Sequence, residues 1–186
     1  MYKRKLNEIR KIVKRIAESE DWKFHILAVV DYSKKLAKIL KVNEEIAELA
    51  ALLHDIGRLK FGGENHHLTG AKEAEKILKK YKFKKEIIGE IKHCIESHRG
   101  ATDITPKTKL AKIIANADVM AHFDNFLVLV YYGAQRKFGY EETIEWLNRK
   151  IERDWEKKLT LSQAKKMMKE KYKAIKLLLN STRKYI

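Results

Sequence analysis

The sequence has little that would break a helix, with one proline and eight glycines in 186 residues. It also lacks runs of alternating apolar and polar residues bounded by Asn-Gly or Asp-Gly turns, the usual signature of β-hairpins. The chain is long enough for one compact domain, and 45% of its residues are apolar, which is enough to fill a core. We therefore predict a single all-α domain over residues 1–186.

Cysteine and long apolar runs are scarce as well. Cys94 is the single cysteine, so an intramolecular disulfide and a metal site made only of thiolates are both excluded. No apolar run approaches the roughly 20 residues that span a bilayer. The basic start of the chain leads into an amphipathic helix rather than the apolar segment of a signal peptide. We expect a cytoplasmic protein that does not associate with membranes.

Positive charge is abundant. The chain carries 41 Lys and Arg against 25 Asp and Glu, a net charge of +16. Such a surface attracts nucleic acid, anionic membranes or phosphorylated metabolites, and charge alone does not choose among them. Most of the lysines fit the solvated faces of helices, and a composition rich in Lys, Glu and Ile is also typical of thermophile proteins.

Apolar periodicity predicts eight helices. Asn43 is a candidate N-cap, and Pro106 suits the entry to a helix. Loops are expected at Phe61–Asn65, whose paired glycines suggest a lid, and at Arg99–Asp103. The predicted helices cover residues 3–18, 22–40, 43–55, 68–81, 84–98, 107–132, 140–157 and 161–180.

The dipeptide His54-Asp55 is the first candidate for chemistry. Apolar residues at helical spacing precede it, and Gly57 is the type of residue that most easily ends a helix. We therefore expect His54 and Asp55 in the last turn of a helix, where exposed carbonyls carry partial negative charge and favour a cation. An imidazole and a carboxylate at that position indicate a metal site.

Two more residues extend this site. His25 lies near the start of a strongly apolar helix, and Asp118 lies between small and apolar neighbours. A buried carboxylate must be paired or bound to a cation, so Asp118 has two candidate partners, a metal ion or His122 one turn further on. Together with His54 and Asp55, these residues offer nitrogen and oxygen ligands suited to a divalent ion.

This order of residues resembles the HD-domain superfamily of metal-dependent phosphohydrolases. The resemblance covers residues 21–127, over half of the chain. Three further segments match the pattern of that family: His66-His67-Leu68-Thr69-Gly70-Ala71, Ile95-Glu96-Ser97-His98-Arg99-Gly100, and Pro106 through Ile114 followed by Ala117-Asp118. The branch that opens cyclic dinucleotides carries Gly-Tyr-Pro after its later histidines, whereas this chain has Arg99-Gly100-Ala101, which disfavours that substrate.

The resemblance implies an all-helical bundle built around an ion. By that resemblance His25, His54, Asp55 and Asp118 would bind Mn, Co, Ni, Fe, Zn or Mg. His66, His93 and His98 would line the pocket and contact substrate phosphate or, as in relatives with more histidines, a second metal, and the match of Ile95 through Gly100 favours His98 over His93. His93 lies five residues from His98, so the two point to different sides of one helix.

Residue chemistry and the resemblance together predict a phosphomonoesterase or phosphodiesterase acting on a nucleotide or similar small phosphorylated metabolite. Asp55 would hold the proton of the attacking water, while Arg58 and His98 would offset developing charge. Many relatives have Lys where this chain has Arg58, and Lys60 is a second candidate phosphate contact. Two alternatives stay open: a nucleic-acid-binding or processing protein that uses its basic surface, and a non-catalytic helical regulator with a structural metal site.

The C-terminal third carries no recognisable catalytic motif. Its tryptophans and leucines, spaced among many lysines, are typical of packing helices. We predict that residues 138–186 form a helical extension that docks on the core of residues 21–127 or serves a homodimer.

Overall fold

The computed structural model describes residues 2–99, 104–135 and 139–183, and their regular elements are all helices, as predicted. Two of them are short π-helical turns, labelled η. The elements are α1 (Lys3–Ile16), η1 (Asp21–Ile26), α2 (Leu27–Leu40), α3 (Glu44–Leu53), α4 (Ile56–Phe61), α5 (His66–Lys80), α6 (Lys85–Ser97), α7 (Lys109–Asp124), α8 (Phe126–Gln135), α9 (Tyr140–Arg153), η2 (Asp154–Lys158) and α10 (Ser162–Arg183).

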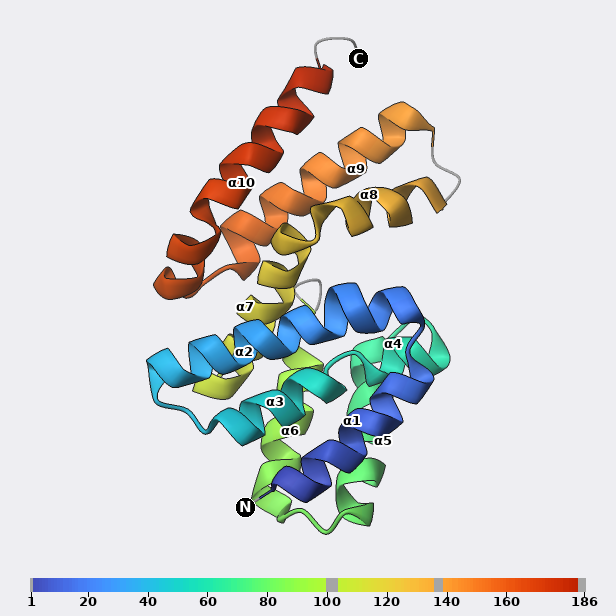
Figure 1. Ribbon diagram of the computed structural model, residues 1–186, viewed down its shortest axis with the longest axis vertical. Coiled ribbons are helices and arrows are strands. Elements are labelled where there is room, and N and C mark those ends of the chain that lie inside the picture. The colour runs from blue at the N-terminus through green and yellow to red at the C-terminus, as the bar shows by residue number, and fades with distance from the viewer. Residues whose placement is uncertain (1, 100–103, 136–138, 184–186) are drawn as a thin grey trace.

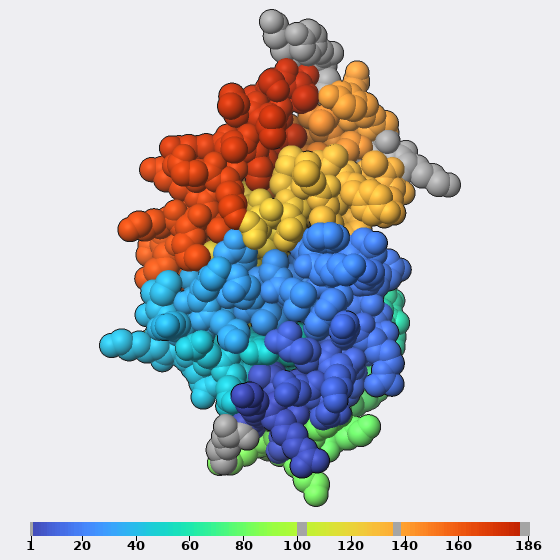
Figure 2. Space-filling model, viewed as in Figure 1, coloured from blue at the N-terminus to red at the C-terminus, as the bar shows by residue number. Residues whose placement is uncertain are grey.

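The helices form a lower and an upper layer (Figure 1). Helices α1 to α6 make the lower layer, α8 to α10 make the upper layer, and α7 runs from one to the other. In the space-filling view the orange and red surface of the C-terminal helices covers the upper half of the molecule and adjoins the blue surface of the N-terminal helices (Figure 2). One buried apolar cluster extends from Leu6 in α1 to Leu179 in α10.

Helix α7 is the central element because it is apolar on nearly every side. Ile113, Ile114, Ala117 and Val119 are all fully buried, as expected of a helix that is surrounded by others. It packs on α2, α3 and α6 of the lower layer and on α8 and α10 of the upper layer. The polar side chains in the middle of α7, Asn116 and Asp118, are therefore held inside the protein.

Local capping follows the sequence where a suitable side chain is present. The Asn43 side chain accepts a hydrogen bond from the Ile46 amide at 3.1 Å and begins α3, as predicted. Helix α7 begins at Lys109 because the Thr108 side chain accepts from the Ala111 amide at 3.1 Å, three residues after the entry expected at Pro106. The predicted loop at Arg99–Asp103 falls largely on residues 100–103, which lie outside the described residues.

The region of His54 and Asp55 differs from the prediction. Helix α3 ends at Leu53, the two residues form a bend, and a separate helix, α4, begins at Ile56. Gly57 therefore lies inside a helix rather than at its end. A Cβ atom at Gly57 would lie 2.1 Å from the His66 carbonyl oxygen and 2.6 Å from the Gly70 amide nitrogen, so glycine is needed here for the close approach of α4 to α5.

The single helix expected over residues 107–132 is two helices. The chain turns by 81° between α7 and α8, with Asn125 outside both helices. In the described part of the chain no single helix has the length and apolarity to cross a bilayer, and only the bent pair α7 and α8 meets that test jointly. The turn brings α8 over the bundle, where it forms part of the cavity described below.

Candidate metal centre

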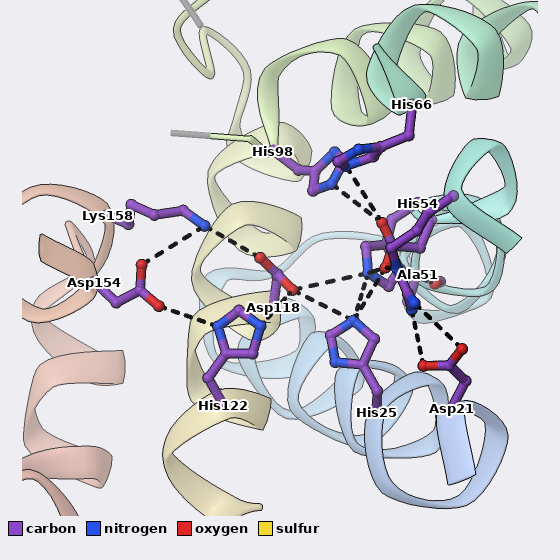
Figure 3. Close-up of polar contacts among 12 residues, drawn as sticks. Asp21, His25, Ala51, His54, His66, His98, Asp118, His122, Asp154 and Lys158 are labelled. Atoms are coloured by element: carbon purple, nitrogen blue, oxygen red, sulfur yellow. Dashed lines mark hydrogen bonds and ion pairs between the residues drawn. The ribbon is translucent and has the colours of Figure 1, made fainter. Parts of the chain in front are cut away.

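The structure brings the four predicted metal ligands together from three parts of the chain, and Figure 3 shows His25, His54 and Asp118 of this group. His25 comes from η1, His54 and Asp55 from the bend between α3 and α4, and Asp118 from α7. The Nε2 atom of His25 lies 3.2 Å from Nε2 of His54, 3.4 Å from Oδ2 of Asp55 and 3.5 Å from Oδ1 of Asp118. His54 is fully buried, and both carboxylates are buried as well.

The imidazoles are oriented by hydrogen bonds to the backbone. Nδ1 of His54 lies 2.7 Å from the Ala51 carbonyl oxygen, so it is the nitrogen that carries the proton in the neutral ring. The pKa of His54 is lowered to about 4 by burial, which keeps the ring neutral. Its Nε2 lone pair therefore faces the ring of His25 and two carboxylates, and a lone pair beside carboxylate oxygens fits a bound cation.

Asp55 faces two groups of histidines with its two oxygens. Oδ2 lies 3.4 Å from His25, while Oδ1 lies 3.5 Å from Nε2 of His98 and 3.6 Å from Nε2 of His66. Nδ1 of His98 and of His66 lies against the carbonyls of Ile95 and Gly63, at 2.6 and 2.8 Å. The structure thus contains a second group of ligand atoms, from Asp55, His66 and His98, that could hold an ion.

Both central carboxylates are held in the charged state. Burial opposes the ionisation of Asp55, but the neighbouring imidazole of His54 and the guanidinium of Arg58 keep its pKa well below the usual range. Burial likewise opposes the ionisation of Asp118, and His122 and Lys158 keep its pKa well below the usual range. Two buried anions beside the unprotonated Nε2 of His54 match the preference of a divalent cation.

Arg58 contacts Asp55 rather than pointing freely into the cavity. Its Nε donates to Asp55 at 2.7 Å, and its two terminal nitrogens donate to both oxygens of Asp21 at 3.1 and 3.2 Å. The Tyr132 hydroxyl of α8 donates to Asp21 at 2.9 Å. This network orients Asp55 and ties it to the upper layer, a positioning role that the sequence did not indicate. The predicted contact between Arg58 and substrate stays a prediction.

Lys60 and His93 lie outside the cavity beside the metal ligands. Lys60 forms an ion pair with Glu73 and is absent from the cavity lining, and its contact with substrate stays a prediction. Because α4 is a separate helix, it turns Lys60 toward α5. His93 accepts a hydrogen bond from the Lys107 amide at 3.0 Å, on a different side of α6 from His98, as expected.

A cavity of about 600 Å³ opens beside the ligand cluster. Its lining includes residues of α8, α9 and η2 that the sequence did not indicate as part of a site: Tyr132, Trp146, Lys150, Arg153 and Lys158. The sequence does contain a pattern that could have indicated part of this lining. Lys150, Asp154 and Lys158 recur every four residues, so they lie in one line along a helix. Alternating charges in such a line are also common on solvent-exposed helices, so the spacing alone did not identify a site.

Comparison with known proteins finds a matching family model and similar sequences. A family model described as HD domain matches residues 24–122, more than half of the chain. The chain is 30% identical over 119 residues to a tRNA (cytidine(56)-2′-O)-methyltransferase of Picrophilus torridus, covering 56% of this chain and 33% of the relative. It is 29% identical over 131 residues to a ribonuclease Y of Symbiobacterium thermophilum, covering 69% of this chain and 21% of the relative.

These two relatives are much longer than the matched region, since the chain aligns with a third or less of their length. Among solved structures, an HD-superfamily hydrolase of Bacillus thuringiensis superimposes with a TM-score of 0.75 at 18% identity, over 100% of this chain and 98% of that one. At this identity the match establishes a shared fold, which includes the C-terminal helices.

Proposed function

This chain belongs to the HD-domain family, and from that premise we propose that it is a metal-dependent phosphohydrolase acting on a nucleotide or similar small phosphorylated metabolite. The resemblance inferred from the sequence motifs is thereby confirmed at the level of the family. The observation that carries the proposal is the pair of buried carboxylates beside the unprotonated Nε2 of His54, an arrangement that a bound cation stabilises.

His25, His54, Asp55 and Asp118 would hold the ion. A divalent ion in this position supplies Lewis acidity, which lowers the pKa of a water and polarises a phosphoryl oxygen. Four protein ligands leave two positions of an octahedral ion for solvent and substrate, which favours catalysis over a purely structural site.

The protein residues have separable roles in this proposal. Asp55 is ionised and accepts a hydrogen bond from the attacking water, which aligns it for attack on phosphorus. Burial disfavours a charged His98, but its hydrogen bond to Asp55 raises the pKa of the imidazole, so His98 is suited to donate to a phosphoryl oxygen. Arg58 keeps Asp55 in place through Asp21.

The cavity supports a substrate of nucleotide size. Its volume of about 600 Å³ is typical of small-molecule sites. Aromatic side chains of Phe24, Tyr132 and Trp146 line it together with several cations. Rings that can pack against a base and cations that can pair with phosphate are the combination that a nucleotide requires.

The test combines elemental analysis of the purified protein with release of inorganic phosphate from a panel of nucleotides, with Mn, Co, Ni or Mg added. His54→Ala and Asp55→Ala should lose both metal and activity while keeping the helical circular-dichroism spectrum. His93→Ala is the matched control, because His93 lies outside the cavity, and it should retain both. Activity that survives in chelator or in both active-site variants would refute the proposal.

Metal stoichiometry also decides the role of His66 and His98. One equivalent leaves them as contacts for substrate phosphate, whereas two equivalents make them ligands of a second ion that shares Asp55.

A second candidate substrate is RNA, favoured by the similarity to a ribonuclease Y and by the net charge of +16. A labelled oligoribonucleotide in the same panel tests it. If RNA is the substrate, its apparent affinity should fall steeply as salt is raised, because phosphate contacts release counterions.

A further inference from the structure

A cluster of charged side chains from α9 and η2 lies beside the candidate metal centre. Asp154, which is fully buried, accepts a hydrogen bond from Lys150 at 3.0 Å. It also lies 3.6 Å from the guanidinium of Arg153 and 3.9 Å from the ammonium of Lys158. One buried carboxylate thus gathers three cations, all of which line the cavity. We call these three cations the α9 cation cluster.

The cluster has more positive charge than Asp154 can balance. Lys158 also pairs with Asp118 at 3.3 Å, so three cations against two carboxylates leave a surplus of one positive charge at the cavity wall. Burial lowers the pKa of Lys150, and an anion entering the cavity would offset that cost. Arg153 contacts Asp154 through one nitrogen while its side chain is 46% exposed, and a guanidinium has five N–H donors in a fork that suits phosphate.

The cluster is continuous with the metal ligands. Lys158 lies between the two sites, with its Nζ 3.3 Å from Oδ2 of Asp118 and 3.9 Å from Oδ1 of Asp154 (Figure 3). His122 makes a second link, since its two ring nitrogens lie 3.6 Å from Asp118 and 3.1 Å from Asp154. A group held by the cluster would therefore lie next to a phosphate ester held at the metal centre.

We propose that Lys150, Arg153 and Lys158 form an anion subsite for a second phosphate of the substrate. The preferred substrate is then a nucleotide with two phosphates, of which one is hydrolysed and the other is held by α9 and η2. This inference rests on the proposed function for the reaction, but the subsite itself is defined by the cations and the cavity. A purely structural cluster, in which the cations only neutralise Asp154 and Asp118, would give no preference for a second phosphate.

The experiment compares adenosine 3′,5′-bisphosphate with the 3′- and 5′-monophosphates of adenosine, using the full-length, metal-loaded protein. The measured quantity is the ratio of kcat/KM for the bisphosphate to that for the better monophosphate. Arg153→Gln should lower this ratio about tenfold, as expected for one charge-assisted hydrogen bond. Arg153→Glu should lower it further, and Arg153→Lys should restore part of it.

Arg149→Gln is the matched control, because Arg149 lies on the same helix, is 70% exposed and pairs with Glu145 instead of the cluster. It should leave the ratio within twofold of the wild type. Thermal unfolding of each variant checks that Arg153→Gln is folded. An unchanged ratio in Arg153→Gln, or an equal fall in Arg149→Gln, would overturn the subsite.

Failure of the reaction and failure of the subsite are distinguishable. If no phosphate is released from any compound, the hydrolase proposal fails, and calorimetric dissociation constants for the same bisphosphate and monophosphates replace the kinetic ratio. Tighter binding of the bisphosphate that is lost in Arg153→Gln would still support the subsite. Adenosine 5′-diphosphate, tested alongside, shows whether adjacent or separated phosphates fit it better.

Discussion

Replacement of Gly57 by alanine tests whether the close contact of α4 with α5 sets the geometry of the metal centre. The new methyl group would lie 2.1 Å from the His66 carbonyl oxygen, 2.6 Å from the Gly70 amide nitrogen and 2.8 Å from the Thr69 hydroxyl oxygen. Two of these atoms are backbone and cannot rotate away. Since non-bonded atoms prefer a separation of about 3.5 Å, the contact at the His66 carbonyl must lengthen by about 1.4 Å, which requires α4 and α5 to move apart.

This displacement has two expected costs. Overpacking in a buried contact should lower the free energy of unfolding by about 3 kcal/mol. The carbonyl that is pushed away belongs to His66, whose ring faces Asp55 at 3.6 Å, and Asp55 directly precedes α4. A shift of about 1 Å between such groups should lower kcat/KM about 100-fold.

Urea unfolding in chelator measures the first quantity, and phosphate release with added metal measures the second. Gly89→Ala is the control, because Gly89 lies in α6 with nothing within 4 Å of its expected Cβ, and there alanine should add about 0.5–1 kcal/mol of stability. Wild-type stability of Gly57→Ala would refute the steric reasoning. Wild-type activity in a destabilised variant would refute the link to the metal centre.

Three further outcomes are expected. In chelator the free energy of unfolding should fall by on the order of 3 kcal/mol from His54 alone as the pH drops from about 6.5 to about 4. The reason is that His54 binds a proton near the ordinary histidine pKa of 6.5 in the unfolded chain but only near 4 in the folded chain. Urea titrations at several pH values measure this fall, and it should be smaller in His54→Asn. Arg58→Lys should lower the free energy of unfolding in urea by about 2 kcal/mol and also lower activity, because one ammonium cannot replace the guanidinium fork that joins Asp21 and Asp55. A variant with unchanged stability and activity would contradict the positioning role. Asp154→Asn should cost about 3–5 kcal/mol by the same assay, because buried cations lose their partner, and a change below about 1 kcal/mol would contradict it.

The sequence predicted the all-α fold because helical periodicity and the scarcity of glycine and proline act locally. For the centre, the residues alone indicated only that a buried Asp118 on an apolar helix needs a partner, and the grouping of Asp118 with His25, His54 and Asp55 came from the resemblance to the HD-domain family. The prediction for Gly57 was wrong, because the sequence does not distinguish a glycine that ends a helix from one that permits a close contact between helices. The contact depends on His66 and Gly70, which approach only in the folded chain.

The C-terminal wall of the cavity was missed for a related reason. Lys150 and Arg153 lie among many surface lysines and arginines, and their sequence neighbours do not distinguish them. What separates them is the 81° turn between α7 and α8, which brings the following helices back over Asp118. Asn125 at that turn carries no strong signal, so a continuous helix was the natural prediction for residues 107–132.

Because α7 runs from the lower to the upper layer, the buried carboxylate of Asp118 contacts groups from both layers. Oδ1 of Asp118 faces the histidines, and Oδ2 faces Lys158. The groups on its two sides are encoded far apart, by residues 25–98 and by residues 150–158. On the proposed function, a designer could therefore exchange α9 and η2 for another helical segment to change which compound the cavity accepts, provided that the replacement also supplies a cation opposite Asp118.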